Sequence, residues 1–203
     1  MLGPKIGILA LQGSYAGHAA MLSRLAVRWC YVRTVNELKL CDALILPGGE
    51  STTQSQLARS CGLDSALADF AAQHPLFGTC AGLILMSQCE DSRVLSLRLL
   101  EVQIERNAYG RQRESFTAPL ELSFAAQETV QFQGVFIRAP QISDSGADVA
   151  VLARWQGHPV LVAHGAHMGM SFHPELTQDA RVHAAWLQQA FDLSKTVVQH
   201  DAR

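Results

Sequence analysis

The stretch Pro75-Leu76-Phe77-Gly78-Thr79-Cys80-Ala81-Gly82 decides how this chain folds. It begins with a short apolar run, which is typical of a buried strand in a parallel sheet. The cysteine follows between small residues, and a helical pattern begins directly after it, over residues 81–87. Where a strand turns abruptly into a helix, the residue at the turn is exposed above the sheet. The stretch therefore predicts an α/β fold that displays Cys80 at the end of a strand.

The N-terminal half repeats this alternation. Strand-like runs lie at residues 6–11, 27–32, 43–46 and 76–78, and helix-like spacing at 18–25, 51–59, 63–73 and 81–87. Strands that alternate with helices predict a mostly parallel sheet with helices on both faces, which is a three-layer arrangement.

The pattern changes after about residue 98. Strands are expected at residues 100–104, 120–124, 130–137, 149–155 and 160–164, with a turn at 156–158 and a closing helix at 180–191. The pattern of this half predicts an antiparallel or mixed extension of the sheet. Because no repeat or linker interrupts the chain, we expect a single domain over residues 1–203, with residues 195–203 as an exposed tail.

Composition narrows the classes of function. Hydrophobic residues make up 48% of the 203 residues, charged residues 17%, and the net charge is −2, so nothing favours nucleic acid as a partner. No run approaches the ~20 apolar residues that span a bilayer, and the N-terminus has no signal-peptide pattern. The five cysteines are odd in number and form no C-x-x-C pair, which argues against disulfides and a zinc site. We therefore expect a cytoplasmic protein without a membrane segment.

Cys80 is the first candidate for chemistry. A helix N-terminus directly behind a thiol favours the thiolate, which is the nucleophilic form. A buried structural cysteine is the alternative, because that is a common fate of this residue.

A second motif, Ser171-Phe172-His173-Pro174-Glu175, presents an imidazole and a carboxylate two residues apart. His173 could take the proton of a thiol and later protonate a leaving amine, while Glu175 orients the ring. The alternative is a histidine satisfied in a surface turn. That is also the interpretation for the seven other histidines, which are His18, His74, His158, His164, His167, His183 and His200.

The third motif, Pro47-Gly48-Gly49-Glu50-Ser51, ends one strand and opens a helix. Two glycines let backbone N–H groups approach a ligand oxygen, so the turn could form an oxyanion hole with the N–H of Ala81. The alternative is an ordinary turn before a helix that is capped by Ser51 or Thr52.

Together these motifs resemble the class I, or triad, glutamine amidotransferases. More narrowly, the chain is similar over about residues 5–192 to the glutaminase subunits of pyridoxal 5′-phosphate synthase. The narrow resemblance rests on the strings at residues 6–13, 46–53, 105–116, 134–140 and 171–176. The segments at 92–101 and 163–167 depart from the family pattern, which leaves local loop shapes and partner contacts open there.

The resemblance implies a flavodoxin-like fold and hydrolysis of L-glutamine to L-glutamate and ammonia, without a metal or an organic cofactor. Cys80 would be the nucleophile, His173 the base and Glu175 its orienting partner. The residues implied to bind glutamine are Gly48, Gly49, Glu50, Ala81, Arg106, Ile137 and Arg138. The ammonia would pass to a (β/α)8-barrel synthase subunit in a large hetero-oligomer, for vitamin B6 biosynthesis.

Two other functions fit the same residues. One is an amidotransferase subunit that serves another acceptor, such as imidazole glycerol phosphate synthase. The other is a catalytically silent binding or redox-sensing module, since a thiol at such a turn also suits sensing.

Overall fold

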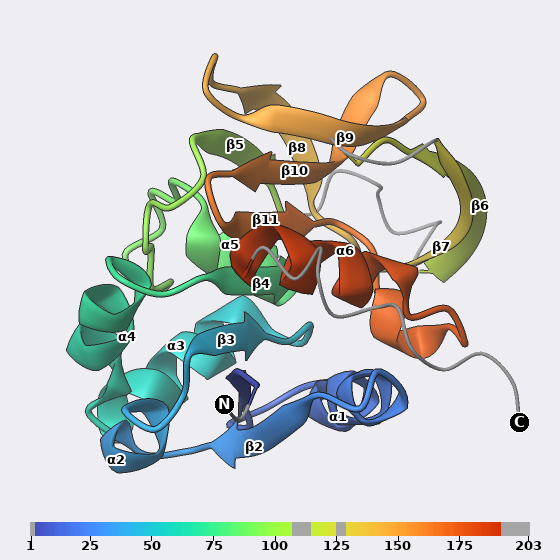
Figure 1. The fold of residues 1–203 in the computed structure, drawn as a ribbon. Coiled ribbons are helices and arrows are strands. Elements are labelled where there is room, and N and C mark those ends of the chain that lie inside the picture. Colours follow the sequence, from blue (N-terminus) through green and yellow to red (C-terminus); the bar gives the residue numbers. More distant parts are fainter. Residues whose placement is uncertain (1–2, 107–114, 125–128, 192–203) are drawn as a thin grey trace, which may run out of the picture.

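The computed structural model describes residues 3–106, 115–124 and 129–191 (Figure 1). The expected tail at residues 195–203 lies outside this part of the chain. Within it, no helix combines the length and apolar character that crossing a membrane requires.

A sheet of seven strands forms the middle layer, in the order β2-β1-β3-β4-β11-β10-β9. Five of its strands run parallel, and β10 and β9 extend it as antiparallel strands. The strands are β1 (Lys5–Leu9), β2 (Arg28–Val32), β3 (Ala43–Leu46), β4 (Leu76–Thr79), β9 (Ala150–Trp155), β10 (His158–His164) and β11 (His167–Met170). The predicted α/β fold, with a mostly parallel sheet and an antiparallel extension, is therefore confirmed.

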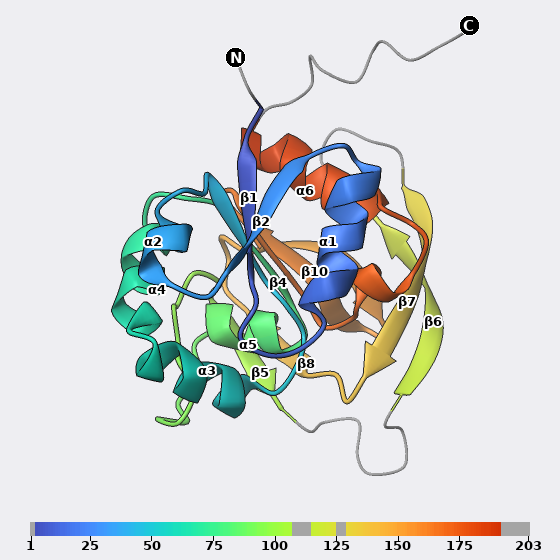
Figure 2. The same ribbon diagram turned by 90° about the horizontal axis from the view of Figure 1, so that it is seen from below.

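Helices cover both faces of this sheet (Figure 2). On one side lie α1 (Tyr15–Arg24) and α6 (Arg181–Phe191), and on the other α2 (Val35–Leu38), α3 (Ser51–Ser60), α4 (Leu63–Ala71) and α5 (Ala81–Met86). The alternation of side chains along each strand explains the two cores. In β3, Ile45 packs with the α1 and α6 side, whereas Leu44 and Leu46 pack with the α3 to α5 side.

The C-terminal half differs from the expectation in the pairing of its strands, and residues 141–145 form a strand that was not expected. Four of its strands pair outside the main sheet, as the ribbons β5 (Val102–Glu105) with β8 (Gln141–Ser145) and β6 (Ser115–Leu122) with β7 (Val130–Ile137). Each ribbon lays one apolar face on a core: Leu120 and Phe132 join the α1 and α6 side, and Val102 and Ile142 the other. Such ribbons cover the sheet and do not widen it.

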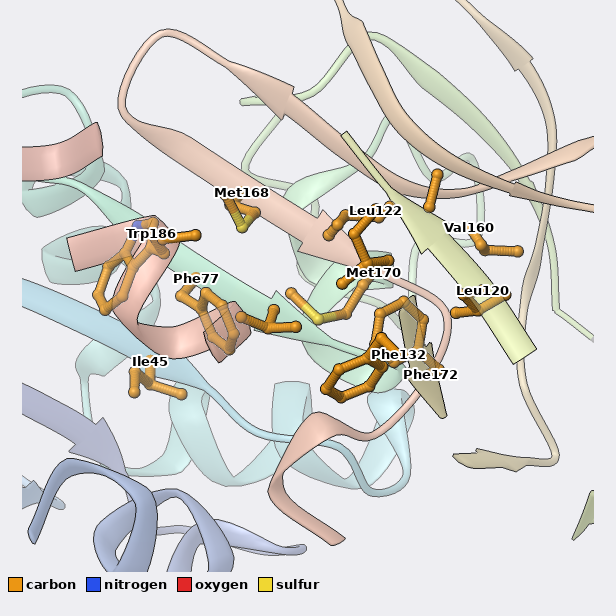
Figure 3. Close-up of a cluster of buried hydrophobic side chains, with 14 of the residues drawn as sticks. Ile45, Phe77, Leu120, Leu122, Phe132, Val160, Met168, Met170, Phe172 and Trp186 are labelled. Atoms are coloured by element: carbon orange, nitrogen blue, oxygen red, sulfur yellow. The ribbon is translucent and has the colours of Figure 1, made fainter. Parts of the chain in front are cut away.

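Aromatic packing links the closing helix to the central strand. Phe77 of β4 and Trp186 of α6 are fully buried, with ring centroids 5.1 Å apart (Figure 3). Because Phe77 lies three residues before Cys80, this contact fixes the strand that carries the cysteine.

The Phe77→Ala variant should lose about 3–5 kcal/mol of free energy of unfolding, since a fully buried ring is replaced by a cavity. Urea denaturation followed by circular dichroism measures this loss. Leu40→Ala is the control, because Leu40 is 65% exposed and its truncation should change the free energy by less than about 0.5 kcal/mol. Equal effects of the two substitutions would contradict this account of the core.

Candidate active site

The C-terminal ends of four strands meet at one edge of the main sheet. Residues 12–14 follow β1, residues 47–49 follow β3, Cys80 follows β4, and His173 comes shortly after β11. In open α/β sheets, ligands bind at the carboxyl ends of the strands, near the point where strand order reverses. Here the order reverses between β1 and β3, so these segments lie where a ligand is expected.

Cys80 occupies the sharp turn that the sequence predicted. Its backbone has φ 48° and ψ −101°, a region that non-glycine residues rarely adopt and that stores strain. The N–H of Cys80 donates to the Met170 carbonyl at 2.8 Å, and its thiol lies 3.8 Å from the Ile137 carbonyl. Gly82 allows the close approach of α5, because a Cβ there would lie 2.0 Å from the Leu46 oxygen.

His173 and Glu175 form a buried ion pair. Their Nδ1 and Oε1 atoms are 2.7 Å apart, and the Ser14 hydroxyl donates to the same carboxylate oxygen at 2.6 Å. Burial by itself lowers the pKa of His173, but the neighbouring Cys80 and the Glu175 carboxylate raise it to about 10. Burial raises the pKa of Glu175, yet the facing histidines and Ser14 hold it at about 2. At neutral pH the pair is therefore an imidazolium facing a carboxylate.

The Gly48-Gly49 turn lies directly against the His173 ring. A Cβ at Gly48 would come within 2.2 Å of its Cε1 atom, so only glycine fits. The Gly48 carbonyl accepts the Ser14 N–H at 3.0 Å. Because the N–H and C=O of a trans peptide point in opposite directions, the Gly49 N–H is turned away from Ser14.

A cavity of about 170 Å³ opens at this edge. It is lined by Gly49, Glu50, Ser51, Cys80, Ile84, Arg106, Ile137, Arg138 and His173. The volume is small beside the roughly 300–1,000 Å³ of pockets for drug-sized ligands, which suits a ligand the size of an amino acid.

Opposite charges meet at the mouth of this cavity. Arg106 Nη1 is 2.7 Å from Asp91 Oδ2, and its Nη2 is 3.7 Å from Glu50 Oε1. The Glu50 carboxylate also caps α3 by accepting the N–H groups of Thr52 and Thr53. Partial burial raises the pKa of Glu50, but hydrogen bonds from the Thr52 and Thr53 hydroxyls, together with these N–H groups, lower it to about 2. The N-cap is thus Glu50, whereas the sequence alone suggested Ser51 or Thr52.

The residues implied by the resemblance gather in one place. Seven of them line the cavity, namely Gly49, Glu50, Cys80, Arg106, Ile137, Arg138 and His173. Gly48 and Glu175 contact the His173 ring from outside the cavity, and Ala81 begins α5 next to Cys80. Among the described residues, no group of three or more His, Cys, Asp or Glu side chains is arranged to hold a metal ion.

Several supporting residues were missed by reasoning from the sequence. Ser14 supports Glu175, and Gln12 and Gln54 hold the glycine turn through bonds of 2.9 Å to the Glu50 N–H and 3.0 Å to the Pro47 carbonyl. Asp91 meets Arg106 from the segment that precedes the atypical residues 92–101. The position of residues 12–14 directly after a buried strand was the available signal.

Comparison with known proteins gives a consistent result. The SNO glutamine amidotransferase family matches residues 8–192. A protein named pyridoxal 5′-phosphate synthase subunit PdxT from Actinobacillus pleuropneumoniae serotype 5b is 44% identical, over 91% of this chain and 94% of that protein. A protein of the same name from Halobacterium salinarum is 46% identical, over 87% of this chain and 90% of that protein.

Solved structures agree. One described as a glutamine amidotransferase is 42% identical, has a TM-score of 0.81, and covers 91% of this chain and 98% of its own. PurLQS from Thermotoga maritima is only 16% identical but has a TM-score of 0.66, over 93% of this chain and 96% of its own, which shows the fold alone.

The fold and the sequence matches thus define a glutamine amidotransferase, which confirms the resemblance. Within that class, the chain belongs to the SNO glutamine amidotransferase family.

The Glu175→Gln variant should be destabilised in a pH-dependent way. Raising the pKa of His173 from 6.5 to about 10 adds stability that is complete below pH 6.5 and is lost as the pH rises through 10. Lowering the pKa of Glu175 from 4.5 to about 2 adds stability that is present above pH 4.5 and is lost as the pH falls through 2. The variant should therefore lose about 3–5 kcal/mol of free energy of unfolding between pH 4.5 and 6.5, where both contributions are complete. The loss should be smaller toward pH 10.

Guanidinium unfolding of both proteins across this pH range measures the difference. Glu90→Gln makes the same chemical change at an exposed side chain and should have little effect at any pH. A loss in Glu175→Gln that does not vary with pH would contradict the ion pair.

Proposed function

We propose that this protein hydrolyses L-glutamine to L-glutamate and ammonia with Cys80, His173 and Glu175, and supplies the ammonia for pyridoxal 5′-phosphate synthesis. One observation carries the proposal: the strained Cys80 turn and the buried His173–Glu175 pair open into the same small cavity. Membership in the glutamine amidotransferase family and the names of its relatives support it.

The charged side chains at the cavity mouth suit the α-carboxylate and α-ammonium groups of free glutamine. Arg106 can bind the α-carboxylate with two parallel N–H donors, and the Glu50 carboxylate can accept the α-ammonium. Both side chains line the cavity, together with Ile137 and Arg138. The side-chain amide of glutamine then extends inward to Cys80.

The reaction starts when the Cys80 sulfur, as the thiolate whose proton His173 holds, attacks the amide carbon. The negative charge that develops on the amide oxygen is stabilised by backbone N–H groups of Gly49 and Ala81. Ala81 is the first residue of α5, so its N–H has no acceptor within the helix. The Gly49 N–H is turned away from Ser14 because Ser14 binds the preceding carbonyl.

His173 completes the transfer of protons. Its Nε2 atom is buried and has no hydrogen-bond partner among the described residues, so it is the nitrogen left to react. The imidazolium donates its proton to the amide nitrogen as the C–N bond breaks, which releases ammonia and leaves a γ-glutamyl thioester on Cys80. The neutral ring then takes a proton from water, and the resulting hydroxide releases glutamate and restores the cysteine.

Ammonia is valuable only if it reaches an acceptor. We propose that it passes to a (β/α)8-barrel synthase subunit within a large hetero-oligomer, as the sequence resemblance implies; the relatives' names support only that they are subunits of a pyridoxal 5′-phosphate synthase. Ile137 is exposed beside the cavity and offers an apolar contact for such a partner. A glutaminase of this kind is expected to be weak alone. A single domain over residues 1–203 and a cytoplasmic location belong to the same proposal.

Replacing the nucleophile tests the chemistry. Cys80→Ala, mixed with the synthase subunit, should lose glutamate release by a factor of about 10³ or more, because the thioester cannot form. Cys61→Ala removes an exposed cysteine and should behave as wild type. Equal rates for Cys80→Ala and wild type would exclude Cys80 as the nucleophile.

Labelling separates catalysis from redox sensing. A diazoketone analogue of glutamine should modify Cys80 and not Cys61. Oxidation of Cys80 by peroxide without any reaction with the analogue would favour a sensor.

Arg106→Ala tests substrate binding. The KM for glutamine should rise by about 10- to 100-fold with little change in kcat, because a charge-assisted contact to the α-carboxylate is lost in ground and transition states alike. Arg154→Ala, which removes an exposed arginine that bonds only the Gly157 carbonyl in the described structure, is the control. A fall in kcat at unchanged KM would overturn this role for Arg106.

A further inference from the structure

Behind the His173–Glu175 pair lies a second buried polar cluster. It consists of His18 of α1, Thr79 of β4 and His183 of α6, and all three are fully buried. Neither histidine lies in a surface turn, which is what the sequence alone suggested for both. Two imidazoles enclosed beneath a sheet edge are costly to bury unless their nitrogens are paired.

Helix α1 brings His18 to Glu175. Gly17 allows the approach, because a Cβ there would lie 2.9 Å from the Glu175 Cγ atom. His18 Nε2 is then 3.6 Å from Glu175 Oε2 and 3.2 Å from Thr79 Oγ1. On the other side of the ring, its Nδ1 is 3.0 Å from His183 Nε2.

The two oxygens of Glu175 have different partners. Oε1 accepts from His173 and from Ser14, whereas Oε2 has no hydrogen-bond partner among the described residues. The His18 Nε2 atom is the polar group that faces Oε2. The oxygen of an ionised carboxylate can only accept hydrogen bonds, so this buried atom needs a donor opposite it.

One tautomer satisfies this cluster. If His183 Nε2–H donates to His18 Nδ1, then His18 carries its own proton on Nε2 and presents it to Glu175 and Thr79. The only cost is an unused lone pair on His183 Nδ1, which has no partner in the described structure. The other tautomer would bury an unpaired N–H on His183 and aim a lone pair at the carboxylate, which is worse on both counts.

The charges agree with this arrangement. Burial lowers the pKa of His18, although Glu175 opposes that shift, and the nearby His173 charge lowers it further. Burial and the proximity of His18 lower the pKa of His183 to about 3. Both rings are therefore neutral at neutral pH, and the groups that face His18 are Glu175, His183, His173 and the Thr79 hydroxyl.

We infer that His18 is a positioning residue of the active site: its Nε2–H holds the Glu175 carboxylate so that the other oxygen orients His173. The inference rests on the proposed glutaminase chemistry. His18 does not touch the reacting atoms and acts only through Glu175. Through Thr79 it also contacts the residue that precedes the nucleophile.

A matched pair of variants tests the role. Counted from Cβ, the amide nitrogen of glutamine takes the place of histidine Nε2, and the amide group of asparagine takes that of Nδ1. His18→Gln thus keeps a donor toward Glu175, whereas His18→Asn keeps only the group that faces His183. In complex with the synthase subunit, His18→Asn should lower kcat by about 10- to 100-fold at an unchanged KM, the usual scale for a residue that orients a catalytic ligand.

The pH profile distinguishes positioning from general structural support. Without its donor, ionised Glu175 is less stable, so the acidic limb of kcat/KM should move upward by about 1–2 pH units in His18→Asn. His18→Gln should retain most of the wild-type kcat and should leave the acidic limb of kcat/KM at its wild-type pH. Urea unfolding of both variants shows whether they are equally stable.

The outcomes separate this inference from the proposed function. If wild type releases glutamate and both variants keep its kcat and pH profile, the positioning role is wrong. If both variants lose activity equally, with no shift of the acidic limb, His18 is structural only, which also overturns the inference. If wild type in complex releases no glutamate, the proposed function itself fails.

Discussion

The parallel pairing of β4 with β11 is the constraint on which the site depends. Its register sets Thr79 opposite Met170, and the Cys80 N–H continues the ladder to the Met170 carbonyl at 2.8 Å. Because both strands run in the same direction, Cys80 and His173 emerge at the same edge of the sheet. The His173 N–H donates to the Val135 carbonyl of β7 at 2.8 Å, so the flanking ribbon also fixes the position of His173.

This constraint explains why the surroundings are so densely bonded. A thiol, an imidazolium and a carboxylate placed above an apolar sheet are held away from water, and each buried polar atom then needs a partner. The partners come from the loop after β1, from α1 and from α6, whereas the cavity residues Arg106 and Ile137 lie at the ends of β5 and β7. Stability and positioning are therefore supplied by the same contacts.

Much of this could be predicted from sequence, and the reason is local. Buried parallel strands are apolar runs, the Cys80 turn needs small neighbours, and His173 and Glu175 are two residues apart, so each signal lies within a short window. The ribbon pairings were not predicted, and neither were the contacts of Ser14 and His18 with Glu175 and of His183 with His18, because these contacts join segments up to 165 residues apart. The hydrophobic periodicity or residue spacing of one segment does not indicate which distant side chain will contact that segment. The contact of Asp91 with Arg106 was missed for the same reason.

Ser14 shows how these long-range contacts tie the parts of the site together. Its hydroxyl has one proton and lies 2.6 Å from Glu175 Oε1 but 3.5 Å from the Gly48 carbonyl, so the charged and nearer oxygen receives it. Its backbone N–H is then the donor that holds Gly48, at 3.0 Å. One residue therefore orients the carboxylate behind the histidine and, through a separate donor, the peptide that aims the Gly49 N–H. A displacement of the loop after β1 would disturb His173 and the Gly49 N–H together, which couples two elements that lie far apart in the chain.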